Sequence, residues 1–260
     1  LDDVKSNLSE VEATPDNDFV SVVKKLTSSL RKKAPTRDSY QTDAQFKEAE
    51  DKFNLDVAKA RNAITDSSNY LSNRLSEATD AETRIDSFVS LADILSFSLD
   101  AIADNRIDDV SRTELENNIV SSFVKSLTSI SDPTIRTQLL TIAQQHKSKK
   151  VRMLVLDNLD KFANGLTADE SKALKKTILK EAMFDQPRSL NPLNGFRDSS
   201  VAEHAYNIFE SKAANNEFSE EDQLDVLSDI YIHSSFSGKI IKKLDNVGSF
   251  LIDNLEKFTI

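Results

Sequence analysis

Cysteine is absent from this chain of 260 residues, which excludes disulfide bonds and thiol chemistry. Glycine and proline are also rare, at 4 and 5 residues, so the chain has little material for the tight turns of β architectures. No apolar run approaches the roughly 20 residues that a membrane-spanning helix requires. With 38% apolar and 7% aromatic residues, the composition indicates an all-α, elongated protein with much solvated surface and no transmembrane segment.

Motifs of known enzyme chemistry are missing as well. The sequence has no glycine-rich phosphate loop and no nucleophile elbow. Its histidines, His146, His204 and His233, lie in separate segments, and none has a second histidine at the spacing that zinc needs on a helix. We interpret His204, beside Glu203, as a helix-surface or partly buried residue. The sequence therefore predicts no catalytic residue, no metal site and no cofactor.

One segment, from Asp104 to Glu114, has the look of a calcium loop. Counting back about twelve positions from Glu114, as the EF-hand pattern requires, places Ala103 at the first ligand position. The same count places Asp108 where glycine is needed for the turn. We therefore interpret Ser111 and Glu114 as the capping residues of a helix.

The chain contains an internal echo, in which residues 151–162 (VRMLVLDNLDKF) return as residues 247–258 (VGSFLIDNLEKF). Identical positions include Asp157/Asp253 and Leu159/Leu255, and similar ones include Asp160/Glu256. The offset is about twice the ~40–47 residues typical of two-helix or three-helix repeats. A weaker copy is therefore expected between the two, and a candidate begins at Val201 (VAEHAYNIFES).

A capping pattern recurs in step with this echo. An apolar residue, a hydroxyl residue, two spacers and an acid follow one another at Val110–Glu114, Leu166–Glu170 and Phe218–Asp222. The hydroxyl accepts from the backbone N–H three residues on, and the acid accepts from the N–H of the cap residue. The pattern predicts helices that begin at Ser111, Thr167 and Ser219.

The N-terminal half shows a different organisation. Residues 1–18 are acidic and polar, which indicates a flexible segment, and an apolar stripe from Phe19 to Leu30 predicts a helix before Pro35. A longer stripe predicts one helix from about Thr42 to Ala78, roughly 55 Å long. Two further helices should run from about Thr79 to Asp104 and from Ser111 to Ile130. Residues 19–130 are thus predicted to be a helical bundle, with the long helix either packed on its neighbours or exposed as a dimerisation seam.

From residue 131 the predicted helices become shorter. Asp132-Pro133 begins one helix with proline in its first turn, and Lys149-Lys150-Val151-Arg152 begins the next. Here the chain resembles HEAT and armadillo-like repeats, best over residues 131–163 and more loosely to residue 260. The resemblance implies a short HEAT-like α-solenoid over residues 131–260. It also implies a scaffold or binding surface that carries no catalytic residues.

Charge is unevenly distributed along the chain, whose net charge is −10. An acidic protein lacks the counterion release that favours binding to nucleic acid. The middle of the chain is nevertheless basic, and this basic middle comprises Lys147, Lys149, Lys150, Arg152, Lys172, Lys175, Lys176 and Lys180. It is either a solvated helix face or an electrostatic docking patch for an acidic partner or membrane surface. The candidate partner-binding lysines are Lys147, Lys149 and Lys150.

The longest irregular stretch inside the repeat region is Asp185–Arg197, which holds two prolines and a glycine. In the repeat register it takes the place of a helix. Its apolar side chains either fold back over the core or present an apolar knob to a partner. The candidate residues are Arg188, Leu190, Leu193, Phe196 and Arg197.

Taken together, these patterns predict a non-enzymatic protein-binding or scaffold protein with a helical-repeat surface. The alternative is a structural or envelope-associated helical protein that forms a homodimer through the long helix, and an enzyme with an unrecognised site comes third. Because the sequence begins with Leu1, we expect some upstream sequence to be missing, and a signal peptide or lipoprotein leader is one option for it. This favours an exported or periplasmic protein, with a lipid anchor as an option, over a cytoplasmic one.

Overall fold

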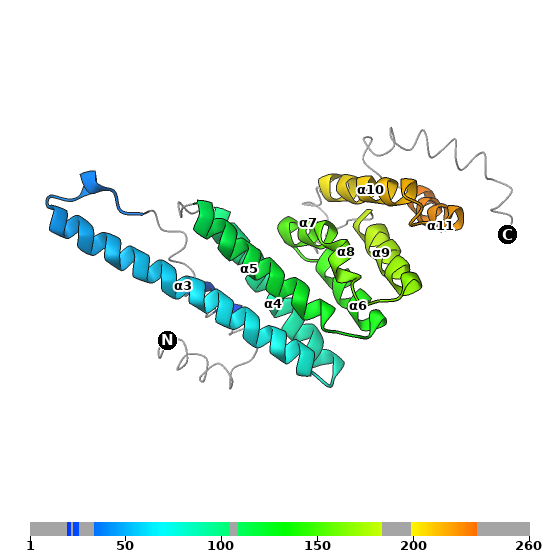
Figure 1. Ribbon diagram of the computed structural model, residues 1–260, viewed down its shortest axis with the longest axis horizontal. Coiled ribbons are helices and arrows are strands. Elements are labelled where there is room, and N and C mark those ends of the chain that lie inside the picture. Colours follow the sequence, from blue (N-terminus) through cyan, green and yellow to red (C-terminus); the bar gives the residue numbers. More distant parts are fainter. Residues whose placement is uncertain (1–19, 22, 26–33, 104–108, 184–198, 233–260) are drawn as a thin grey trace. The chain divides into compact units, whose positions relative to one another are not determined.

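The computed structural model describes residues 20–21, 23–25, 34–103, 109–183 and 199–232. All secondary structure in these residues is helical and none is strand, which confirms the predicted all-α class. The chain divides into two compact units, Leu1–Ile130 (unit 1) and Ser131–Ile260 (unit 2). Figure 1 shows the helices of each unit. Within the described ranges, no helix combines the length and apolarity needed to cross a bilayer.

Unit 1 is built from three long helices that all pack on one another: α3 (Asp43–Glu77), α4 (Ala81–Ala103) and α5 (Asp109–Thr128). The start of α3 is fixed by a capping box, in which Thr42 and Gln45 exchange hydrogen bonds of 3.2 Å. Ala78 is its C-cap, so the long helix has the bounds that the apolar stripe predicted. Helix α4 lies within its predicted range, whereas α5 begins two residues before the predicted start at Ser111 and ends two residues before Ile130.

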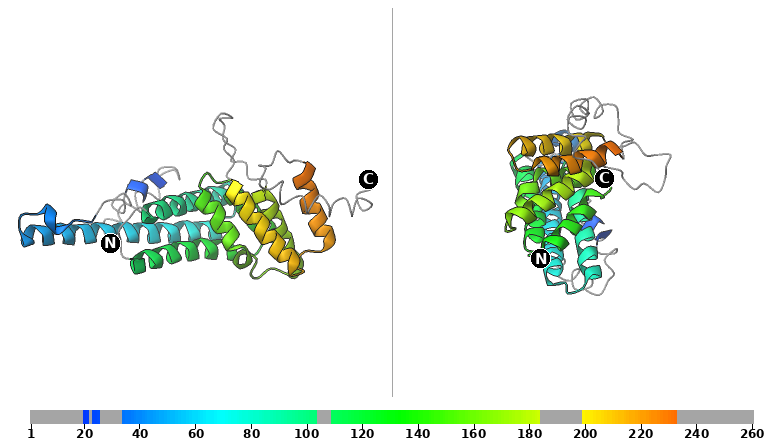
Figure 2. Two further views of the ribbon diagram at one scale, coloured as in Figure 1. Left: turned by 90° about the horizontal axis from the view of Figure 1, so that it is seen from above. Right: turned by 90° about the vertical axis from the view of Figure 1, so that its right-hand side faces the viewer.

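The core of unit 1 occupies only part of α3. All the buried residues of α3 lie between Ala60 and Leu75, whereas Phe46 and Phe53 are half-buried. The first half of α3 extends past α4 and α5, as both views of unit 1 show (Figures 1 and 2). A short 3-10 helix, η2 (Arg37–Ser39), contacts α3 near this end. Inside the core, the rings of Phe88 and Phe123 lie 5.5 Å apart.

Unit 2 consists of shorter helices, which are α6 (Pro133–Gln144), α7 (Lys149–Asp157), α8 (Leu159–Phe162), α9 (Ala168–Met183), α10 (Ser199–Ala214) and α11 (Glu220–Ile232). Helix α9 packs on α6 on one side and on α11 on the other, while α10 packs on α7. In addition, α6 packs on α7, and α9 packs on α10 (Figure 1). The contacts therefore connect α6, α9 and α11 in series, and α7 with α10.

Helix starts in unit 2 follow the sequence signals closely. The Asp132 carboxylate accepts from the N–H groups of Thr134 and Ile135 at 2.8 and 3.2 Å, and Pro133 occupies the first turn of α6. Thr167 and Glu170 exchange hydrogen bonds before α9 at 2.9 and 3.3 Å. Ser219 and Asp222 do so before α11 at 3.1 and 3.2 Å. These starts confirm the predicted caps at Thr167 and Ser219.

The predicted start of a helix at Ser111 is wrong. Helix α5 already includes Asp109, so Ser111 lies within the helix rather than at its N-cap. The apolar-hydroxyl-acid pattern also occurs inside helices by chance, because serine and glutamate are common on exposed helix faces.

Two arginines of unit 2 are buried and cap the ends of neighbouring helices. Arg136 Nη1 donates to the carbonyl oxygens of Phe162 and Asn164 at 2.9 and 2.8 Å, just past the end of α8. Arg152 Nη1 donates to the carbonyl of His146 at 2.6 Å, just past the end of α6. Helix C-termini leave unpaired carbonyls that carry partial negative charge, so a guanidinium both satisfies and stabilises them. Burial lowers the pKa of Arg136 from its ordinary value.

The weaker sequence copy that begins at Val201 has the same burial register as the segment that begins at Val151. The buried residues of the first segment include Val151, Arg152, Val155, Leu156 and Leu159, and those of the second include Val201, Ala202, Ala205, Tyr206 and Phe209. Leu159 is 2% exposed, in agreement with its predicted burial. The other member of the echo, residues 247–258 with Leu255, lies outside the described residues.

The irregular stretch Asp185–Arg197, which was expected to take the place of a repeat helix, lies outside the described residues. The helix that packs beside α6 is α9, and α9 precedes residues 184–198 in the chain. Those residues lie between α9 and α10 in the sequence.

Candidate functional site

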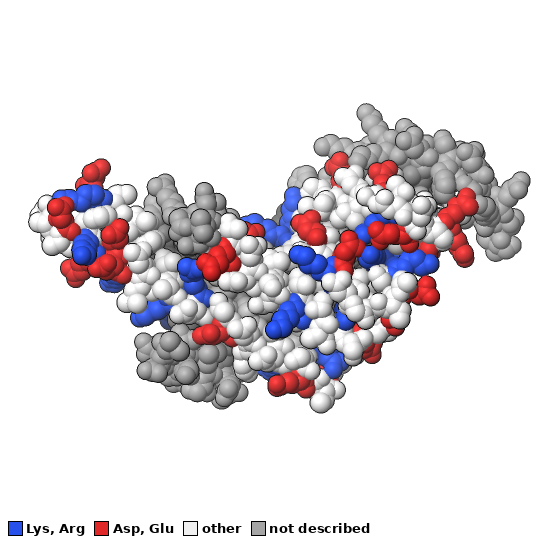
Figure 3. Space-filling view, viewed as in Figure 1, with Lys and Arg blue, Asp and Glu red and all other residues white. Residues whose placement is uncertain are grey.

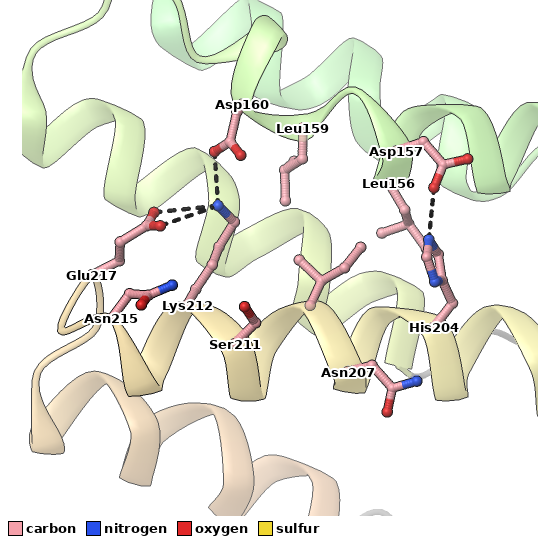
Figure 4. A pocket seen from close by; sticks show the side chains of 11 residues that line it. Leu156, Asp157, Leu159, Asp160, His204, Asn207, Ser211, Lys212, Asn215 and Glu217 are labelled. Carbon is pink, nitrogen blue, oxygen red and sulfur yellow. Dashed lines mark hydrogen bonds and ion pairs between the residues drawn. The ribbon is translucent and has the colours of Figure 1, made fainter.

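A groove in unit 2 runs between α7 and α8 on one side and α10 on the other. It encloses about 470 Å³, within the ~300–1,000 Å³ range of many ligand sites. Leu156 and Leu159 project from α7 and α8 toward α10, and Ile208 joins them in the lining (Figure 4). Polar side chains of both walls surround this apolar strip. The groove is therefore an amphipathic surface with an apolar floor and a polar rim.

One end of the groove is bridged by a histidine and an aspartate. His204 Nε2 lies 2.7 Å from Asp157 Oδ1 (Figure 4). The pair connects α10 to the last residue of α7, and the Asp157 side chain is 57% exposed. His204 is half-buried, as the sequence interpretation expected, and its ring is positioned by a carboxylate.

The other end is bridged by a closed ring of four charged side chains. Lys212 of α10 lies 2.7 Å from Asp160 Oδ1 and 3.3 Å from the Glu217 carboxylate. Lys175 of α9 completes the ring at 2.6 Å from Asp160 and 3.0 Å from Glu217. Each ammonium thus touches both carboxylates, and the ring ties α8, α9 and α10 together.

The ring buries its cations and exposes its anions. The side chains of Lys212 and Lys175 are 8% and 13% exposed, whereas that of Asp160 is 69% exposed. Burial tends to raise the pKa of Asp160, but hydrogen bonds from Lys175 and Lys212 outweigh it and hold that pKa below its usual value. The pKa of Glu217 is lowered in the same way. The rim that faces solvent is consequently made of ionised carboxylates at neutral pH.

A second set of ion pairs joins α9 to α11. Lys172 and Lys176 lie 3.2 and 3.1 Å from the Asp222 carboxylate, and Lys176 lies 3.0 Å from Asp225. Lys180 lies 3.5 Å from Asp225. Acidic and basic side chains are accordingly interspersed over unit 2 in Figure 3. The α9 lysines of the basic middle are thus paired with carboxylates within the chain.

The structure does not place the three described partner-binding candidates, Lys147, Lys149 and Lys150, in the groove. Lys147 lies between α6 and α7, Lys149 and Lys150 lie in the first turn of α7, and all three are exposed. The other candidates, Arg188, Leu190, Leu193, Phe196 and Arg197, lie outside the described residues. Arg152 of the basic middle is buried and caps α6.

Sequence reasoning missed the residues that line the groove. A signal was nevertheless present, because Asp157 and Asp160 belong to the echo and return as Asp253 and Glu256. The partners His204 and Lys212 gave no comparable signal. Their pairing depends on α7 and α10 packing side by side, and Lys212 is 52 positions from Asp160 in the sequence.

A second hollow, of about 580 Å³, lies in unit 1 around the turn from α3 to α4. Its lining includes Tyr70, Arg74, Asp80 and Thr83. Asp80 caps α4 there, because it accepts from the Thr83 N–H at 2.7 Å, and this hydrogen bond lowers the pKa of Asp80. The polar groups of this hollow thus have a structural use at the helix start.

Comparison with protein-family models, with curated proteins and with solved structures found no match for this chain. In the part of the chain that the structure describes, no three His, Cys, Asp or Glu side chains are grouped as a metal site would need.

Proposed function

We propose that this chain is a non-enzymatic protein-binding protein, and that the groove between α7/α8 and α10 is where it binds. The groove carries this proposal because it is open, of ligand size and amphipathic. Its charged side chains are already paired across the groove, as Asp157 with His204 and Asp160 with Lys212. Such pairs fix the walls in place, which favours recognition of a partner by a preformed surface.

Under this proposal, unit 2 is a short HEAT-like array of helix pairs. Support comes from the serial contacts of α6, α9 and α11, from the packing of α10 on α7, and from the shared burial register of α7 and α10. Each pair would then cover the apolar face of the previous one, as stacking repeats do. The groove lies between the second helices of successive pairs, so it is a product of the stacking.

Site-directed photocrosslinking tests the proposal. A photoreactive phenylalanine analogue replaces Ser211, which is exposed and lines the groove, or Ala173, an equally exposed position on α9 outside it. In cells that express the full chain, position 211 should yield a discrete crosslinked protein and position 173 should not. Crosslinks of equal strength at both positions, or none at 211, would contradict a binding function for the groove.

A second candidate function, dimerisation through the long helix, is favoured by the first half of α3. The apolar stripe that α4 and α5 bury from Ala60 onward continues through Phe53 and Phe46, which are only half-buried. Phe53→Glu should then convert a dimer to a monomer in sedimentation velocity. Leu55→Glu is the matched control, because Leu55 is 56% exposed and lies on the opposite face of the helix. A wild-type chain that sediments as a monomer excludes this candidate.

A further inference from the structure

We propose that the groove between α7/α8 and α10 takes a peptide segment whose apolar side chains alternate with lysine or arginine. The inference rests on the proposed binding function and specifies the chemistry of the partner. The basic middle of the sequence suggested an acidic partner, whereas the groove is proposed to bind a basic one.

The first step is the electrostatics of the rim. The groove presents the carboxylates of Asp157, Asp160 and Glu217, with side-chain exposures of 57%, 69% and 37%. The ammonium groups that balance the ring lie beneath them, at 8% and 13% exposure. A charge near the surface acts on an approaching ligand more strongly than one that the protein surrounds and pairs. The face of the groove is therefore negative toward solvent.

The second step is the unused hydrogen-bonding capacity of these carboxylates. The contacts of Asp157 and Asp160 to His204, Lys175 and Lys212 all use Oδ1. Within the described part of the chain, Oδ2 of each aspartate accepts no hydrogen bond. An ionised carboxylate accepts at both oxygens, and a guanidinium or ammonium is its strongest donor. Each aspartate can thus accept from a basic side chain without breaking its internal pair.

The third step is the remaining lining of the groove. Ile208 is half-buried and lies between the two bridges, next to Leu156 and Leu159, which are 2% exposed. An apolar side chain of the ligand would contact Ile208 between two basic ones. On the α10 wall, Ser211 and Asn215 are exposed and uncharged. An amide or hydroxyl can donate to or accept from a peptide backbone, and it does not repel a cation. An acidic segment would meet three carboxylates and no exposed ammonium.

A fourth, independent observation comes from the internal echo. Asp157 is identical in the second copy, as Asp253, although packing places no demand on a side chain that is 57% exposed. In the same window the buried Leu154 and Leu156 are replaced by Phe250 and Ile252, whereas the buried Val151, Leu159 and Phe162 are kept. Asp157 is therefore kept together with core residues, although its own burial does not require it. Asp160 likewise keeps its charge, as Glu256.

The test uses the full chain and two synthetic peptides with the same leucine positions. One carries lysine and the other glutamate at the intervening positions, and both are labelled for fluorescence anisotropy. At ~0.1 M salt, where charges act over about 10 Å, the lysine peptide should bind at least about tenfold more tightly than the glutamate peptide. Asp157→Asn combined with Asp160→Asn should weaken its binding about fivefold or more.

Controls separate the groove from general attraction to an acidic protein. Asp66→Asn combined with Asp169→Asn removes two exposed carboxylates outside the groove and should change the affinity less than about twofold. Because Asp160→Asn touches the ion-pair ring, Ser211→Arg is a second variant. It adds a positive charge to the groove, leaves the ring intact, and should also weaken binding of the lysine peptide.

Three results would overturn the inference. Equal losses in both double variants would mean that the peptide senses only net charge. No binding of the lysine peptide would mean that the groove does not take such segments. Equal binding of both peptides, abolished by Ser211→Trp, would show a groove that binds without regard to charge. In that last case the proposed binding function stands and only the partner chemistry fails.

Discussion

Three cations of unit 2 with little exposure, Arg136, Lys175 and Lys212, each have two acceptors, and this explains why they are tolerated. Arg136 pairs with two carbonyls, and Lys175 and Lys212 each touch both carboxylates of the ring. A buried charge without such partners is strongly destabilising. The arginines of the Asp-Pro and Val-Arg segments therefore have a structural use at helix ends, whereas the carboxylates of the ring remain exposed to a partner.

The first prediction at this scale concerns Leu159, the first residue of α8, which is 2% exposed. Leu159→Ala should lower the free energy of unfolding by about 2–5 kcal/mol, because it removes buried methyl groups and leaves a cavity. Urea unfolding monitored by circular dichroism measures the loss. Leu55→Ala, at a position that is 56% exposed, should change it by no more than about 0.5 kcal/mol. Similar losses in the two variants would contradict the burial of Leu159.

Among the elements, the helix caps provide the next prediction. Thr167→Ala and Ser219→Ala should each destabilise the chain by about 1 kcal/mol, because each leaves a backbone N–H at a helix start without its acceptor. Ser111→Ala is the comparison, since Ser111 lies inside α5, where alanine is the better helix former. Melting temperatures of the three variants check this. A larger loss for Ser111→Ala than for the other two would restore the original assignment of three caps.

Local signals predicted most of the elements, and tertiary pairing accounts for what they missed. The long helix was predictable because its apolar stripe and its capping residues agree. The break between α7 and α8 was not predicted. It falls at Asn158, whose side-chain and backbone N–H groups both donate to the Leu154 carbonyl, at 2.9 and 3.1 Å. The segment Asp157-Asn158-Leu159 lies within a continuous apolar stripe, so the sequence pattern did not indicate a helix break there.

The candidate site was less predictable than the fold. The rim residues Asp157 and Asp160 belong to the echo. Their place in a groove follows only from the packing of α10, which positions His204 and Lys212 opposite them. Basic residues of the middle segment suggested the opposite charge for a partner. That inference counted charges along the chain, whereas the α9 lysines are paired with acids from α8, α11 and the α10–α11 connection.

Acid should destabilise unit 2. The carboxylates of Asp160, Glu217, Asp222 and Asp225 all have pKa values below their usual range. Lysines outweigh the effect of burial at Asp160, Glu217 and Asp225, and hydrogen bonds from Ser219 and from lysines do so at Asp222. Groups of this kind stabilise the folded state above their unfolded pKa, and this contribution is lost as pH falls through the lowered folded pKa. Urea midpoints should therefore fall steadily below about pH 4.

Replacing Asp222 by the uncharged asparagine tests whether its carboxylate contributes to the loss of stability in acid. Asp222→Asn should make the chain less stable at pH 7 and flatten the fall toward low pH, because one of the depressed carboxylates is gone. Asp66→Asn, at an exposed position of α3, should leave the slope unchanged. A pH dependence that Asp222→Asn leaves as steep as in the wild type would show that other groups cause the acid loss.

For the whole molecule, the division into two units predicts two separate unfolding events. Phe123 packs with Phe88 inside unit 1, and Leu159 is buried inside unit 2. Each unit has its own apolar core, so local opening of one core need not expose the other. In hydrogen exchange of the intact chain, Phe123→Ala should speed exchange in α3, α4 and α5 and leave α6 to α11 unchanged. Leu159→Ala should do the reverse, and faster exchange throughout the chain in either variant would show that the two cores unfold as one.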